Sequence, residues 1–123
     1  MAKALALIVE DDRDLSTIFA DTLHEAGFNV EVARDGRVAL IRLAEMVPDV
    51  VILDINLPFV SGAEVLMHIR ADARMAQTRV IVVTANPQMA SMVEDQADLV
   101  LIKPVGFAQL FSLAIRLRPQ TCD

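Results

Sequence analysis

The stretch LALIVEDDRDLS, residues 5–16, runs from an apolar segment straight into three consecutive acidic residues, Glu10, Asp11 and Asp12. The apolar part does not alternate with polar residues, which predicts a strand covered on both faces. Carboxylates about 4 Å apart repel by roughly 1 kcal/mol in water and about 4 kcal/mol near a protein surface. Either a bound cation or a solvated loop relieves such repulsion, and this stretch alone leaves both open.

Four more segments have the length and composition of strands. They are residues 28–33, 50–53, 80–83 and 99–102. The last three are continuous apolar runs, as expected for buried parallel strands. The segment 28–33, FNVEVA, alternates more and is predicted to lie nearer the edge of the sheet.

Segments with helical periodicity separate these strands, and capping or breaking residues bound them. Their apolar positions, in chain order, are Leu15, Ile18, Phe19, Thr22 and Leu23 before Gly27; Val38, Leu40, Ile41 and Leu43 between Asp35 and Pro48; Val65, Leu66 and Ile69 after Ser61; and Phe107, Leu110, Phe111, Ala114 and Ile115 before Pro119. Residues 87–95 form a weaker helical segment. Five βα units predict an α/β fold with a doubly wound five-stranded parallel sheet.

Composition narrows the class of protein. The chain has 123 residues, 54% of them hydrophobic, and a formal net charge of −6, which suits one globular domain and argues against direct nucleic-acid or anionic-membrane binding. The single cysteine, Cys122, excludes an internal disulfide and is interpreted as an incidental tail residue rather than a nucleophile. No apolar run approaches membrane-spanning length. A cytoplasmic location is therefore expected.

Reactive residues follow four of the predicted strands. Glu10 and Asp11 follow the first, Asp54 the third, Thr84 the fourth and Lys103 the fifth. The carboxyl ends of parallel strands meet at one edge, where such folds bind ligands. Oxygen ligands suit Mg²⁺, an Asp carboxylate can attack phosphorus, and an ammonium with a hydroxyl can stabilise the transferred group. The competing interpretation is that charges follow strands because loops are solvated.

Other chemistries have weaker support. The two histidines, His24 and His68, fall within predicted helices and are interpreted as surface or interface residues rather than ligands. No glycine-rich phosphate loop is present. A haloacid-dehalogenase-type phosphatase also uses an Asp at a strand end, but that class has a DxD motif where this chain has Asp54-Ile55-Asn56.

The motifs LIVEDD, VVILDINLPFVSG, VIVVTA and LIKP, in this order and spacing, resemble the receiver domain of two-component response regulators. The resemblance extends from Ala4 to Leu117, and implies a flavodoxin-like, CheY-like fold with a single receiver domain over 1–123 and a core of about 4–117. By this resemblance Asp54 is the phosphoacceptor. The metal ligands for Mg²⁺ are then the side chains of Glu10, Asp11 and Asp54 and the backbone carbonyl of Asn56. Asp12 is a solvated neighbour of this set.

The resemblance also assigns the remaining residues of the site. Thr84 is similar to a switch hydroxyl that moves toward the phosphoryl group, and Lys103 to the lysine that grips it. The Lys103–Pro104 bond is expected to be cis. Asn56 and Asn86 occupy positions that tune the lifetime of the aspartyl phosphate.

The implied function is a phosphoacceptor that assists its own phosphorylation and dephosphorylation, rather than a classical enzyme. A histidine kinase or a phosphotransfer protein supplies the phosphoryl group, a downstream protein or effector domain is regulated, and a homodimer is left open. The alternative is a pseudo-receiver, an interaction module that is never phosphorylated. The sequence does not distinguish a stand-alone regulator from a receiver cut from a longer protein.

The chain departs from the family pattern in its readout region. Val100 stands where a Tyr or Phe switch is common, and the segment from Thr84 to Lys103 is short and contains Pro87, which predicts a short or irregular fourth helix. Phe59 stands where a small or acidic residue is more common, and would place an apolar side chain beside the acceptor. The hypothesis is that output comes from the loop after the fourth strand and the short helix. There, Met89, Met92 and Val93 form either an adaptable contact surface or ordinary core.

Overall fold

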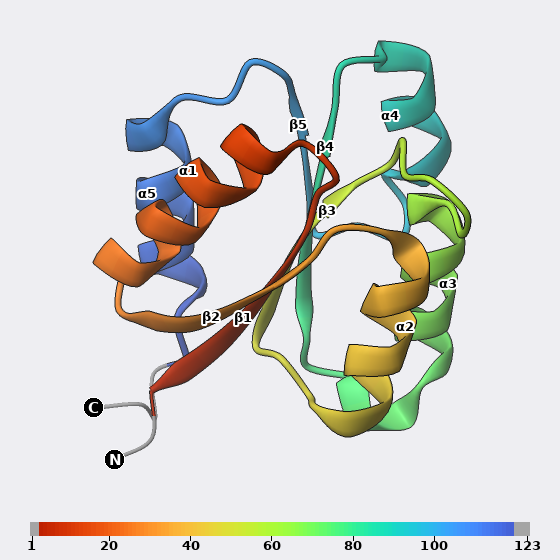
Figure 1. Ribbon diagram of the computed structural model, residues 1–123, viewed down its shortest axis with the longest axis horizontal. Helices are drawn as coiled ribbons and strands as arrows, with labels where there is room; N and C mark the ends of the chain where they lie inside the picture. Colours follow the sequence, from red (N-terminus) through yellow and green to blue (C-terminus); the bar gives the residue numbers. More distant parts are fainter. Residues whose placement is uncertain (1–2, 120–123) are drawn as a thin grey trace.

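A five-stranded parallel sheet forms the centre of the molecule in the computed structural model, which describes residues 3–119 (Figure 1). The strands are β1 Ala4–Val9, β2 Phe28–Ala33, β3 Val50–Asp54, β4 Arg79–Thr84 and β5 Leu99–Ile102. Their order is β2-β1-β3-β4-β5 and every pairing is parallel. The predicted fold class is confirmed, and the more polar β2 does lie at an edge.

Helices cover both faces of this sheet. They are α1 Arg13–Glu25, α2 Gly36–Glu45, α3 Gly62–Ala71, α4 Pro87–Val93 and α5 Phe107–Leu117, with a 3₁₀ turn at Ala73–Met75. Figure 1 shows α1 and α5 on one side and α2, α3 and α4 on the other. Each layer buries its own apolar cluster against the sheet. The strand order reverses between β1 and β3, and such a switch point opens a crevice at the carboxyl ends of the strands.

Helix α4 has seven residues, so the predicted short fourth helix is confirmed. It begins with Pro87, which fits the first turn of a helix because its missing N–H needs no partner there. Val93 is buried and Met89 packs against the core, whereas Met92 is 77% exposed. Of the three apolar residues proposed as a contact surface, Val93 is therefore in the core, Met89 is half-buried against it, and Met92 faces solvent.

Three of the predicted helix faces are partly wrong. In α5, Phe107 and Ile115 are exposed, and only Leu110 and Ala114 are fully buried. In α2, Val38 and Ile41 are exposed, and the smaller Ala39 lies against the sheet with Leu43. In α1, Ile18 is exposed while Ser16 is buried. Burial of Ser16 costs little because its hydroxyl donates to the Arg13 carbonyl within the same helix, at 2.9 Å.

No helix within residues 3–119 is long and apolar enough to cross a membrane. Cys122, interpreted as a tail residue, lies outside the described residues.

Candidate functional site

Three carboxylates meet at the carboxyl edge of the sheet, as their positions after β1 and β3 predict. Glu10 and Asp54 are 1% and 5% exposed, whereas Asp11 faces solvent. One oxygen from each of the three side chains lies within 4.8 Å of the others. Solvent therefore relieves the repulsion between carboxylates only at Asp11. The buried carboxylates of Glu10 and Asp54 need a positively charged partner.

Lys103 reaches these carboxylates from the end of β5. Its Nζ donates to Glu10 Oε1 at 3.0 Å and to Asp54 Oδ2 at 3.4 Å. The backbone N–H of Lys103 donates to the Thr84 carbonyl at 2.9 Å, which extends the pairing of β4 and β5 to the site. The Lys103–Pro104 peptide bond is cis, the expected isomer.

The environment changes the protonation of two of these groups. Burial raises the pKa of Glu10 to about 7 from its ordinary 4.5, and the nearby Asp54 charge adds to this, although the hydrogen bond from Lys103 opposes it. Burial alone would lower the pKa of Lys103. The hydrogen bond to Glu10 and the charge of Asp54 outweigh burial, so the pKa of Lys103 lies above its usual value.

Backbone hydrogen bonds orient the polar residues around the cluster. Asn56 N–H donates to Asp54 Oδ1 at 3.0 Å, which fixes one acceptor oxygen and leaves the Asn56 side chain exposed. Thr84 is fully buried, and its hydroxyl accepts from the Asn86 N–H at 3.1 Å. Thr84 is thus the last residue of strand β4, at the same end of the sheet as the carboxylates. Its hydroxyl oxygen already accepts a hydrogen bond from the loop that precedes α4.

Two residues have helix-capping roles that the sequence prediction missed. Asp12 is the N-cap of α1, accepting from Leu15 N–H at 3.0 Å, and its own N–H donates to Glu10 Oε2 at 3.1 Å. Asn86 is the N-cap of α4 and accepts from Gln88 and Met89. An Asp or Asn directly before a helical run is a known N-cap signal and could have identified both.

Phe59 and Val100, two of the departures from the family pattern, have clear positions. Phe59 is 70% exposed and has a left-handed backbone with φ of 68°, and the Arg37 guanidinium lies 3.6 Å from the centre of its ring. Its ring therefore contacts α2, in addition to facing solvent. Val100 is half-buried and packs against the core on the side of α2, α3 and α4. Since the residue is Val, no aromatic ring of β5 occupies this position.

The donor set fits a hard divalent cation. Once Glu10 has lost its proton, three carboxylates face one ammonium, which leaves two negative charges in excess, and the oxygens that carry them converge. Mg²⁺ prefers oxygen ligands and keeps several of its bound waters. This site offers carboxylate oxygens and is open to solvent on the side of Asp11, where such waters would lie.

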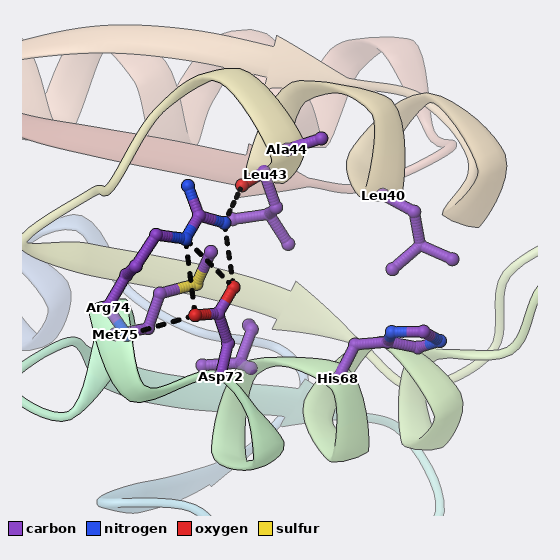
Figure 2. A pocket seen from close by; sticks show the side chains of 8 residues that line it. Leu40, Leu43, Ala44, His68, Asp72, Arg74 and Met75 are labelled. Atoms are coloured by element: carbon purple, nitrogen blue, oxygen red, sulfur yellow. Dashed lines mark hydrogen bonds and ion pairs between the residues drawn. The ribbon is translucent and has the colours of Figure 1, made fainter.

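A hollow of about 250 Å³ lies elsewhere, between α2 and α3 (Figure 2). Within it, the Arg74 guanidinium bonds both Asp72 and the Leu43 carbonyl, and the hydrogen bonds from Arg74 hold the pKa of Asp72 below its usual value. His68 lines the hollow and is exposed, in agreement with its interpretation as a surface residue; His24 is also exposed. None of the five predicted site residues after the strands lines this hollow.

Comparison with known proteins gives consistent results. The family model for the response regulator receiver domain matches residues 6–115. The transcriptional regulatory protein TrcR of Mycobacterium tuberculosis is 34% identical over 107 residues, covering 85% of this chain and 41% of that protein. The DNA-binding dual master transcriptional regulator RpaA of Synechocystis sp. is 31% identical over 109 residues, covering 86% of this chain and 45% of that protein. The chain thus spans less than half the length of these curated relatives.

Solved structures show the same similarity. Chemotaxis response regulator CheY4 of Vibrio cholerae matches with a TM-score of 0.84 and 29% identity, covering 93% of this chain and 98% of that one. The receiver domain of sensor histidine kinase PA1611 of Pseudomonas aeruginosa, whose active-site cleft holds a coordinated magnesium ion, matches with a TM-score of 0.85 and 26% identity, covering 94% and 98%. The chain belongs to the receiver domain family of two-component response regulators.

Proposed function

We propose that Asp54 accepts a phosphoryl group from a histidine kinase or a phosphotransfer protein, and that the modified domain regulates a downstream protein. The observation that carries this proposal is the position of the Asp54 carboxylate at the end of β3. It is 5% exposed, 3.4 Å from Lys103 Nζ, and adjacent to Glu10 and Asp11. A carboxylate held in this way is a nucleophile with a cation already directed at it.

The residues of the chain divide the work of the transfer. A carboxylate oxygen of Asp54 forms the bond to phosphorus while the bond from phosphorus to the donor imidazole nitrogen breaks, and the electron pair stays on that nitrogen. Lys103 is placed to neutralise charge on the transferred oxygens, because its ammonium already lies between Glu10 and Asp54. The Thr84 hydroxyl can donate to the same oxygens, and Asn56 and Asn86 are proposed to tune the lifetime of the aspartyl phosphate.

Mg²⁺ is the proposed cofactor, held by Glu10, Asp11, Asp54 and the backbone carbonyl of Asn56. When bound, it supplies positive charge that neutralises the phosphoryl oxygens. The magnesium in the similar PA1611 receiver and the acidic cluster of this chain both support this choice.

The direct test is intact-mass measurement after incubation with a small phosphodonor such as phosphoramidate, with Mg²⁺ or with a chelator. We expect the mass to increase by one phosphoryl group only with Mg²⁺, and no increase in Asp54→Asn. The matched control is Asp12→Asn, which changes the same functional group in an exposed neighbour and keeps a good N-cap for α1. The proposal is refuted if the wild type gains no phosphoryl group and binds no Mg²⁺, or if Asp54→Asn is modified as readily as the wild type.

The remaining parts of the proposal concern context. The chain acts as a single receiver domain over 1–123, as a phosphoacceptor rather than a classical enzyme, in the cytoplasm and without direct contact to nucleic acid or membrane. Names such as DNA-binding regulator among longer relatives support a separate effector as the output. The partners proposed for this chain also include a second copy of itself in a homodimer. The pseudo-receiver alternative is not supported, because the acidic residues and Lys103 lie together in the structure.

A further inference from the structure

The loop between β3 and α3, residues 55–61, contains an unusual residue. Phe59 adopts a left-handed backbone conformation, with φ of 68°, although it is a bulky residue. Such a conformation is rare outside glycine and persists only where surrounding contacts hold it. Phe59 is also 70% exposed, so burial in the core does not provide those contacts.

The contacts come from the first turn of α2. The Arg37 guanidinium lies over the Phe59 ring, 3.6 Å from its centre, in a cation–π arrangement. One residue earlier, the backbone of Gly36 lies so close to the loop that an added Cβ would be 2.0 Å from the Val60 carbonyl oxygen. The side chain of Asp35, the N-cap of α2, lies 3.9 Å from Arg37 and helps to orient it. The loop therefore rests on α2 at two consecutive residues.

This contact matters because of what else the loop carries. Asn56 lies three residues before Phe59, and its N–H bonds to Asp54 Oδ1 at 3.0 Å. The start of the loop is fixed by Ile55, which is 1% exposed, and by the bond from Gly62 N–H to the Ile55 carbonyl at 3.0 Å. The contact with Arg37 fixes the far side. Leu57 and Val60 of this loop also pack against the core, so Phe59 is the exposed point at which α2 can influence the path of the loop that carries the Asn56 carbonyl.

We propose that Arg37 and Phe59 are positioning residues that hold the β3–α3 loop against α2, so that the Asn56 carbonyl is placed as a ligand for a divalent cation beside Asp54. The inference rests on the proposed function and extends it to two residues that touch neither the acceptor nor the cation. Arg37 acts through Phe59, and Phe59 acts through the loop backbone.

The test is a double-mutant cycle in which Mg²⁺ affinity is measured by titration of backbone amide signals. Because a cation–π contact at an exposed site is weak, we expect Arg37→Ala and Phe59→Leu each to weaken Mg²⁺ binding by about two- to fivefold. The double variant should be no weaker than the worse single variant, and Phe59→Trp should retain wild-type affinity. Arg116→Ala is the charge-matched control, since this exposed side chain lies beside Asp49 and Arg79 at the opposite edge of the sheet.

Phe59→Gly distinguishes positioning from general stabilisation. Glycine adopts a positive φ without strain, so we expect the urea midpoint to stay the same or rise while Mg²⁺ affinity falls. In the metal-free domain, amide exchange of residues 56–60 should also become faster in Arg37→Ala than in Arg116→Ala. If the wild type binds Mg²⁺ but the Arg37 and Phe59 variants bind it equally well, the inference is wrong and the proposed function stands. If the wild type binds no Mg²⁺ and gains no phosphoryl group, both fail.

Discussion

Removing Mg²⁺ should make the stability of this domain fall as the pH rises, because of Glu10. The folded domain keeps a proton on Glu10 up to about pH 7, whereas the unfolded chain releases it near 4.5. Between these values the folded state binds the extra proton, so the free energy of unfolding decreases with rising pH. At about 1.4 kcal/mol per pKa unit, the whole difference corresponds to about 3 kcal/mol.

Other shifted groups do not hide this effect. The hydrogen bonds from Val80 and Arg70 overcome burial and lower the pKa of Asp98 below 3.8, so its stabilisation is complete before pH 4.5. The pKa of Lys103 is raised above 10.5, so its stabilisation is lost only at much higher pH. The interval from pH 5 to 8 therefore reports mainly on Glu10 among the groups with shifted pKa values.

The assay is urea unfolding followed by far-ultraviolet circular dichroism in the presence of a chelator, at several pH values from 5 to 8. We expect the fall in the wild type, little or none in Glu10→Gln, and the full fall in the exposed control Glu25→Gln. Mg²⁺ at a hundred times its dissociation constant should restore about 2.7 kcal/mol at pH 8, because it binds only the folded state. A free energy of unfolding that is flat or rises across this interval, or an equal fall in Glu10→Gln, would refute the reasoning.

Three further predictions address the scaffold and the output region. Gly36→Ala should lower the free energy of unfolding in urea by about 1–3 kcal/mol, because its Cβ would overlap the Val60 carbonyl. Gly106→Ser adds an N-cap hydroxyl to α5 where a Cβ meets nothing within 4 Å, so it should raise that free energy by a few tenths of a kcal/mol. Equal effects of the two substitutions would contradict this. Arg70→Lys should cost about 2 kcal/mol in urea, because one ammonium cannot replace a guanidinium that bonds three acceptors; an unchanged midpoint would contradict it. A stable phosphoryl mimic should shift amide signals within residues 85–98 of the wild type but not of Asp54→Asn, and an absence of shifts there would disprove readout through α4.

Most of the fold was predictable from the sequence because each signal is local. Continuous apolar runs such as residues 50–53 identify buried strands, and Gly27 and Pro48 end the helices next to them. The site was predictable for the same reason. Once the strands are parallel, Glu10, Asp54 and Lys103 must reach one edge whatever the details of packing.

What the sequence left undetermined depends on partners that are distant in the chain. The choice between Ile18 and Ser16 as the buried residue of α1 depends on hydroxyl bonding within the helix and on the fit to α5. The Phe59 ring contacts Arg37, in another βα unit, and no local pattern specifies that pair. Arg70 reaches the loop before β5 across 26 residues, and periodicity does not reveal such contacts.

Position 100 holds Val rather than an aromatic residue, so we expect any readout of phosphorylation to depend on α4 and on how its two ends are held. At its start, the Thr84 hydroxyl accepts the N–H of Asn86, and Asn86 in turn caps the helix. At its end, Arg70 holds the Gln96 carbonyl at 2.6 Å and Asp98 at 2.9 Å, which anchors the chain before β5.

A Thr84 hydroxyl that turns toward a phosphoryl group on Asp54 changes its hydrogen bonding with Asn86. A bond of this kind contributes about 0.5–1.5 kcal/mol. A helix as short as α4 is not stable on its own in water, so the loss of one such bond at its start matters. Because Arg70 anchors the far end, we expect the change to be confined to the residues between Thr84 and Gln96. If Asp54 is phosphorylated as proposed, we expect the seven-residue α4, with Met92 exposed, to be the segment whose surface changes, without a ring on β5.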